Sequence, residues 1–231
     1  MQSVFCRYEK KYLLTSEQLC GINAALSRYM TPDNYAKYLV QNIYFDTENW
    51  DVVRASIENP VYKEKMRLRC YSDSEIFLEL KKKYNGLVCK RRIPVSKAKS
   101  VHNIVMEDSS QIGREFEFYL RSNPVFERIY ISYNRTAFSG DDELRITFDE
   151  NLKFRSSKLN FSHPNDGQPI TNDIIMEIKT PAAIPMWLAK VLSENKIFPI
   201  SFSKYGTCYK NHILNKPHLI YEGTRKIARA S

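Results

Sequence analysis

The sequence predicts an α+β protein built on a closed, mainly antiparallel sheet whose charged faces point into its interior. About eight segments have the composition of strands, and turn signals such as "YNG" at 84–86 and "SGDD" at 139–142 separate some of them. Charged and apolar residues alternate within these segments. Helical segments between them are numerous enough to cover an apolar outer surface. The 231 residues, 43% of them hydrophobic, suffice for one core, so we expect one domain over 1–215 and a basic tail, 216–231.

In the first half of the chain, strands and helices alternate before three strands follow one another. Residues 3–14 predict a strand, and 15–30 predict a helix because a Thr-Ser start signal precedes apolar positions at helical spacing. The β-branched and aromatic stretch 37–47 predicts the next strand, and 48–57 predicts a helix. The three consecutive strands are expected at 64–72, 75–83 and 86–94.

The second half repeats this mixture of strands and helices. Two amphipathic helices are expected at 96–107 and 109–122, and the polar stretch 156–169 has the composition of a loop. The apolar stretch 182–195 predicts a helix, and 201–214 predicts another after its first residues. The remaining strands are expected at 126–138, 143–154 and 173–180.

The charge balance favours an anionic partner. The chain has 35 Lys and Arg against 26 Asp and Glu, a net charge of +9, which suits nucleic acid, a phosphorylated metabolite or an anionic membrane surface. Five cysteines without a CxxC pair, and four histidines without ligand spacing, predict neither zinc nor a catalytic thiol or imidazole. Because no secretory leader is visible, we expect reduced thiols and a cytoplasmic location. No apolar run reaches the ~18 residues that a membrane span needs.

One face of nearly every predicted strand is charged, because strand side chains alternate with period two. A half-buried sheet with its charged face in water is the simple interpretation of any single strand. Arg and Lys dominate these faces, however, with single acids among them. The residues of the charged faces are Arg7, Glu9, Lys11, Arg67, Arg69, Glu79, Lys81, Lys83, Lys90, Arg92, Arg145, Thr147, Asp149, Glu177 and Lys179.

A barrel with charges inside explains these faces better. About ten cations on one continuous surface would repel each other unless an anion lies among them. A polyanion and a divalent cation would compensate for burying such an interior, since Arg and Lys bind phosphate and carboxylates bind metal. Asp149 shares a face with Arg145, and we expect these two residues to pair.

Nine segments in order also resemble the catalytic domain of the vacuolar transporter chaperone (VTC) family, from about residue 5 to 210. They are "RYEKKYLL", "NIYFDTEN", "MRLRCY", "FLELKKK", "CKRRIPV", "YNRTAF", "LRITFD", "IIMEIK" and "SFSKYG". These domains belong to the triphosphate tunnel metalloenzymes, relatives of the CYTH phosphatases. The resemblance implies an eight-stranded antiparallel tunnel, open at both ends. It also implies synthesis of inorganic polyphosphate from ATP, releasing ADP, with Mn²⁺ or Mg²⁺.

Site residues follow from the resemblance position by position. Glu177 matches the metal-binding glutamate, and Glu9 and Glu79 are similar to acidic positions of the wider superfamily, so all three are expected metal ligands. Arg7 and Lys179 are expected to bind substrate. The first strand has Arg-x-Glu-x-Lys where the CYTH branch has Glu-x-Glu-x-Lys, which favours the VTC branch. The residues expected to contact phosphate during catalysis are Lys11, Arg67, Arg69, Lys81, Lys90, Arg92, Arg135, Arg145 and Lys204.

Three alternatives to a polyphosphate polymerase stay open from the sequence. The same tunnel could hydrolyse tripolyphosphate or a nucleoside triphosphate, with Glu9 or Glu79 orienting water. It could bind polyphosphate without catalysis, or the basic surface could bind nucleic acid, although single acids among the cations suit a short phosphate chain better. We therefore expect ATP and inorganic polyphosphate as ligands and no specific nucleic acid. Eukaryotic relatives also carry a phosphate-sensing domain and membrane helices; we expect neither within these 231 residues, so a separate membrane protein stays open as a partner.

Overall fold

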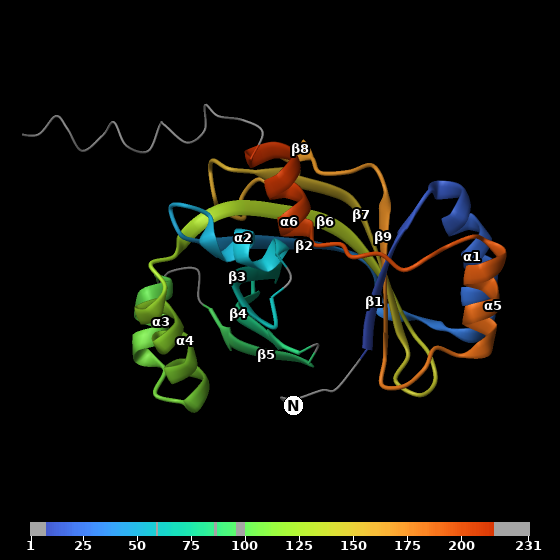
Figure 1. Cartoon of the computed structure of the whole chain (residues 1–231), viewed down its shortest axis with the longest axis horizontal. Coiled ribbons are helices and arrows are strands. Elements are labelled where there is room, and N and C mark those ends of the chain that lie inside the picture. The colour runs from blue at the N-terminus through green and yellow to red at the C-terminus, as the bar shows by residue number, and fades with distance from the viewer. Residues whose placement is uncertain (1–7, 59, 86, 96–99, 215–231) are drawn as a thin grey trace, which may run out of the picture.

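The computed structural model describes residues 8–58, 60–85, 87–95 and 100–214, which form one curved antiparallel sheet with helices around it (Figure 1). Arg7 and the predicted tail 216–231 lie outside the described residues. The strands are β1 (Tyr8–Leu14), β2 (Thr31–Asp46), β3 (Tyr62–Ser72), β4 (Glu75–Tyr84), β5 (Leu87–Pro94), β6 (Phe126–Ser139), β7 (Arg145–Arg155), β8 (Gln168–Pro169) and β9 (Ile174–Thr180).

The strand order is β1-β9-β7-β6-β2-β3-β4-β5, and every pair is antiparallel. The short β8 pairs with β7 beside this path. The predicted α+β class and the eight long strands are therefore confirmed. Each predicted strand overlaps an observed one, because the period-two alternation is a local signal, although β2 begins at Thr31, before the predicted start at residue 37.

The expected closure of the sheet is wrong. β1 and β5 are the two ends of the hydrogen-bonded order and face each other across the concave side (Figure 1). The outer edge of β1 is used by another segment, since the N–H of Ile200 donates to the Lys11 carbonyl at 2.8 Å. Side chains bridge the two sides instead, with Lys81 Nζ 3.4 Å from a carboxylate oxygen of Glu9.

Two pairs of helices cover the convex face of the sheet. α1 and α5 pack on β1, β9 and β7, where Ile22 and Leu188 meet Tyr12 and Met176. α3 and α4 pack on the other end of the sheet, with Phe116 against β3 and β4. The start signal of α1 is confirmed as a capping box between Thr15 and Gln18. These helices are α1 (Ser16–Tyr29), α3 (Val101–Glu107), α4 (Gln111–Ser122) and α5 (Met186–Glu194).

Part of the concave face is apolar, which the residue pattern of the sequence did not predict. α2 (Asp51–Ile57), α6 (Lys204–Cys208) and the π-helix η1 (Tyr209–Ile213) pack against it. Their buried residues form one cluster with inward-facing side chains of β2, β6, β7 and β9, such as Val40, Ile129 and Ile175. The inward face therefore changes from apolar to charged along single strands, as from Ile131 to Arg135 in β6. The charges occupy the remaining part of the concave side.

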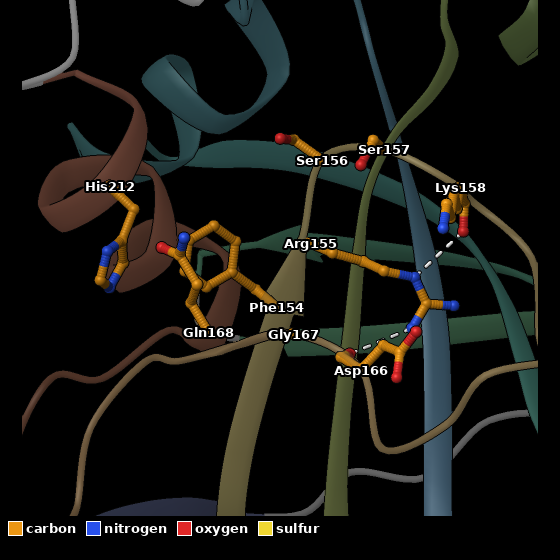
Figure 2. A pocket seen from close by; sticks show the side chains of 9 residues that line it. All are labelled: Phe154, Arg155, Ser156, Ser157, Lys158, Asp166, Gly167, Gln168 and His212. Atoms are coloured by element: carbon orange, nitrogen blue, oxygen red, sulfur yellow. Dashed lines mark hydrogen bonds between the residues drawn. The ribbon is translucent and has the colours of Figure 1, made fainter.

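The predicted loop 156–169 is organised by the last residue of β7, Arg155. Its guanidinium donates to the carbonyls of Lys158 at 3.0 Å, His163 at 2.6 Å, Asp166 at 3.1 Å and Asn160 at 2.5 Å. Figure 2 shows two of these bonds beside a pocket that the loop lines together with η1. The guanidinium also lies 3.6 Å from the ring centroid of Tyr130. Arg155 therefore holds the loop rather than a ligand.

Among the described residues, none of the helices combines the length and the apolar character that crossing a bilayer requires.

Candidate functional site: the ionic interior

The charged part of the concave side forms what we call the ionic interior. It consists of side chains from β1, β3, β4, β5, β6, β7 and β9, and of the first residue of α6. Three buried acids each hold cations from neighbouring strands. The members of the ionic interior are Glu9, Lys11, Arg67, Arg69, Glu79, Lys81, Lys90, Arg135, Asp149, Glu177, Lys179 and Lys204.

Glu79 is the centre of the first group. Arg67, directly opposite on β3, contacts Glu79 Oε2 from Nε at 2.9 Å and from Nη2 at 2.7 Å. Arg69 lies 3.6 Å from the same oxygen, and Lys90 of β5 pairs with the other oxygen. Burial alone would raise the pKa of Glu79, but the charges of Arg67, Arg69 and Lys90 hold it well below its usual range. Glu79 therefore stays ionised and fixes three cations.

Tyrosines orient the two arginines of this group. Arg67 Nη1 donates to the hydroxyl of Tyr44 at 3.1 Å. Arg69 donates to the hydroxyls of Tyr71 at 3.1 Å and Tyr133 at 3.4 Å. Hydroxyl acceptors are neutral, so they fix the guanidinium planes without cancelling their charge. That leaves both arginines suited to bind phosphate oxygens.

Asp149 is the centre of the second group and has 0% exposure. It accepts a bidentate pair from Arg135, Nε to Oδ1 at 2.6 Å and Nη2 to Oδ2 at 2.8 Å. Lys204 Nζ lies 2.6 Å from Oδ2. The expected pairing of Asp149 with Arg145 is wrong, because Arg145 Nη2 contacts Asp33 at 2.6 Å. The strand register places Arg135 directly opposite Asp149, while Arg145 lies at the far end of β7.

Glu177 forms the third group with Lys179 and Lys11. Lys179 Nζ lies 3.2 Å from Glu177 Oε1, and Lys11 is the register partner of Glu177 on β1. Burial lowers the pKa of Lys11 to about 8, although Glu177 opposes this shift. The nearby cations, Lys179 foremost, hold the pKa of Glu177 well below its usual range despite its burial. Lys11 also donates to the Phe202 carbonyl at 3.0 Å, so the segment before α6 borders this group.

The structure brings most of the predicted site residues together, with clear exceptions. Arg145 pairs with Asp33 and its side chain is 38% exposed, although it is the register partner of Lys179 in the Glu177 group. The Arg92 guanidinium lies 4.9 Å from the ring centroid of Phe77, beside the Glu79 group. Arg7 lies outside the described residues. Lys81 reaches the interior through its ion pair with Glu9.

The three predicted metal ligands share no ion pair: Glu79 and Glu177 are the centres of separate groups, and Glu9 pairs with Lys81. Among the described residues no three His, Cys, Asp or Glu side chains gather as a metal site. Magnesium is often bound by one or two carboxylates together with substrate phosphates, so a single carboxylate fits such an ion when phosphate is present. Glu177 fits best, because Thr147, its register partner on β7, has a buried hydroxyl that makes no hydrogen bond within the described residues. The assignment of Glu177, Glu9 and Glu79 as ligands stays a prediction.

The structure adds residues to the site that the sequence pattern did not predict. Lys65 of β3 donates to Ser203 Oγ at 3.2 Å, and the buried Tyr133 lies against Arg135 and Lys204. Lys65 shares the face of Arg67 and Arg69, so the period-two pattern contained that signal. Tyr133 had no such signal, because aromatic residues are ordinary in strands.

Among solved structures, the chain is similar to the protein PH1819 from Pyrococcus horikoshii OT3, with 14% identity, TM-score 0.49, and 88% of this chain and 98% of that chain covered. It is similar to the inorganic triphosphatase NE1496, with 12% identity, TM-score 0.31, and 80% and 85% covered. A Mimivirus capping enzyme triphosphatase matches with 11% identity, TM-score 0.40, and 81% and 87% covered. No curated protein matched the sequence.

The family model of the VTC domain matches residues 6–213. This range contains all the described members of the ionic interior and every strand of the sheet. The resemblance of the nine segments is thereby confirmed over nearly the whole chain. The chain belongs to the VTC domain family.

Proposed function

We propose that this protein is a polyphosphate polymerase that transfers the γ-phosphate of ATP to a growing inorganic polyphosphate chain. The observation that supports this most is the charge excess of the ionic interior, where eight cations surround four acids. An excess of positive charge raises the free energy of the folded protein when it is removed from water, and a bound polyanion offsets this rise. Membership of the VTC domain family supports a phosphoryl-transfer reaction.

The residues of the interior align the two substrates. Arg67 and Arg69, with their planes set by tyrosines, hold the oxygens of the acceptor chain, while Arg135 and Lys204 stabilise charge on the transferring phosphoryl group. A terminal phosphate oxygen of the chain attacks the γ-phosphorus, the bond from that phosphorus to the bridging oxygen breaks, and ADP leaves with the electron pair. The attacking oxygen is already ionised near neutral pH. No general base is then required, and positioning and charge stabilisation supply the catalysis.

Mn²⁺ or Mg²⁺ would be held by the Glu177 carboxylate together with phosphate oxygens. When bound, such an ion would neutralise part of the negative charge on the phosphates. Lys179 must then give up part of its contact with Glu177 and turn to phosphate. This exchange is consistent with the position of Lys179 next to the predicted ligand, at 3.2 Å.

The test is incubation of the purified protein with ATP and Mn²⁺, with ADP, free phosphate and polyphosphate resolved over time. We expect ADP and long phosphate chains to appear together, and Glu177→Gln to lose this product by 10²-fold or more, roughly the cost of one lost charge-stabilising group. Glu64→Gln is the matched control, because Glu64 pairs with Lys82 on the opposite face of the sheet. Free phosphate without polymer would assign the interior to a triphosphatase instead. Tight binding without turnover would reduce it to a binding module.

A further inference from the structure

Three aromatic side chains of β2, β3 and β4 lie at one end of the ionic interior. We call Tyr38, Tyr71 and Phe77 the mouth aromatics. The ring centroids of Tyr38 and Tyr71 are 6.1 Å apart, and those of Tyr71 and Phe77 are 6.3 Å apart. Tyr71 and Phe77 flank the turn between β3 and β4, where residues 72–75 are all exposed. The rings therefore lie where the interior meets solvent.

The mouth aromatics face the ionic interior. Phe77 is the register partner of Arg69, and cross-strand partners share one face of a sheet. Tyr38 is the register partner of Arg135 in the same way. The Tyr71 hydroxyl accepts a hydrogen bond from Arg69 Nη1 at 3.1 Å. All three rings are therefore on the same side of the sheet as the cations of the interior.

The exposure of these rings distinguishes them from aromatic residues of the core. Each mouth aromatic is half-buried. Tyr44 and Tyr205, by contrast, stack at 4.8 Å with an interplanar angle of 24°, and they are only 7% and 1% exposed. The mouth aromatics are tilted by 57° and 66°, so their faces are not stacked on one another. Apolar ring surface left in water favours a ligand that covers it.

Guanidinium groups border the same rings. The Arg92 guanidinium carbon lies 4.9 Å from the ring centroid of Phe77, and that of Arg69 lies 5.7 Å from the ring centroid of Tyr71. Aromatic rings together with arginines are the combination on which proteins stack the bases of nucleic acids without reading their sequence. This end of the interior therefore has the composition of a platform for a planar base.

We propose that the mouth aromatics bind the base of the nucleoside triphosphate by stacking, and that Phe77 and Tyr71 favour a nucleotide over inorganic tripolyphosphate. This inference rests on the proposed function and deepens it, because it assigns the part of ATP that cations do not recognise. A phosphate chain has no apolar surface to place on these rings, whereas a nucleotide joins a planar base to its phosphates. Tyr38 lies opposite Arg135, one of the two cations assigned above to the transferring phosphoryl group. A base on the rings therefore directs its phosphates toward that cation.

The experiment measures binding of ATP, GTP and tripolyphosphate by calorimetric titration without a divalent ion, so that no turnover occurs. Phe77→Leu removes a ring but no hydrogen-bonding group. We expect this variant to bind ATP and GTP about tenfold more weakly, as for the loss of one base–aromatic stack, and tripolyphosphate as well as wild type does. Phe77→Tyr keeps the ring and should keep the nucleotide affinity. Because every base has a π-face, ATP and GTP should bind with similar affinity.

Tyr84→Leu is the matched control. Tyr84 lies at the other end of β4, is 62% exposed, and follows Lys82 by two residues, so both lie on the same face of the sheet. Lys82 contacts Glu115 of α4 at 3.7 Å, which places that face on the convex side. Loss of the Tyr84 ring should leave the affinity for all three probes unchanged.

The outcomes separate this inference from the proposed function. An unchanged ratio of ATP to tripolyphosphate affinity in Phe77→Leu overturns the stacking site and leaves the polymerase proposal standing. An equal loss for all three probes also overturns it, since Phe77 then only positions the neighbouring arginines. Much weaker binding of GTP than of ATP indicates recognition of base edges and contradicts stacking as the basis. If wild type binds none of the probes, the proposed function fails together with this inference.

Discussion

Tyr205 donates a 2.7 Å hydrogen bond to the fully buried carboxylate of Asp46, and this bond connects the start of α6 to the end of β2. Asp46 also accepts from the N–H groups of Val52 and Val53 at the start of α2, each at 2.9 Å. Lys204, the residue before Tyr205, reaches Asp149. The Asp46–Tyr205 pair therefore holds α6 in the position from which Lys204 enters the ionic interior.

Removing the Tyr205 hydroxyl should move Lys204. We expect Tyr205→Phe to reduce stability by about 1–2 kcal/mol, the usual cost of leaving a buried acceptor with one partner fewer. Measured well below the melting temperature, affinity for tripolyphosphate should fall several-fold. A purely structural role for Tyr205 predicts the stability loss alone.

Tyr119→Phe is the control for this change. Tyr119 is as buried as Tyr205, but its hydroxyl makes no hydrogen bond within the described residues, so its loss should change neither stability nor affinity appreciably.

Asp149→Asn should destabilise the free protein by about 3–5 kcal/mol, because Arg135 and Lys204 then remain buried without their shared acid. A polyanion should restore part of this loss. Urea denaturation with and without tripolyphosphate measures both effects. Stabilisation by tripolyphosphate that is no larger in the variant than in wild type would contradict a phosphate-binding role for these two cations.

Binding of phosphate chains should depend on pH through Lys11 and Lys65. Burial lowers their pKa values to about 8 and about 7, from an ordinary value near 10.4. A bound polyanion favours the charged form, so binding takes up protons, and affinity falls as pH rises from 7 to 9. Calorimetry in buffers of different ionisation enthalpy measures this uptake. Proton release on binding would refute the assignment.

The same pKa values give the opposite trend for the stability of the free protein. Between pH 7 and 10, the unfolded chain holds protons on these lysines that the folded protein has lost. The free energy of unfolding therefore rises with pH through their contribution. Lys65→Met should flatten this rise, and denaturation midpoints at pH 7 and 9 provide the comparison.

Arg155→Lys should reduce stability without affecting the site. An ammonium group cannot reproduce four bonds from a planar guanidinium to carbonyls of one loop, and we expect a loss of about 2–3 kcal/mol. Affinity for tripolyphosphate should be unchanged. Arg121→Lys, at an exposed position of α4, should change neither quantity.

Local patterns in the sequence determined much of this protein. The alternation of charged and apolar residues in β3, β4 and β9 places Arg67, Glu79 and Glu177 on the inward face. This alternation is visible in the sequence alone. The capping box of Thr15 and Gln18 sets the start of α1 in the same way. Such signals lie within a few residues of each other, so each strand or helix contains its own information.

Only the tertiary structure decided which charges meet and where the sheet ends. From the sequence, Asp149 could pair with any cation of the interior. The register between β6 and β7 places Arg135 opposite it, and α6 places Lys204 in contact with it. The edge of β1 is used by Ile200 rather than by β5, and α2, α6 and η1 cover part of the concave face with apolar side chains. Residue patterns along one strand contain no information on these contacts, because register and sheet curvature arise from packing between segments far apart in the chain.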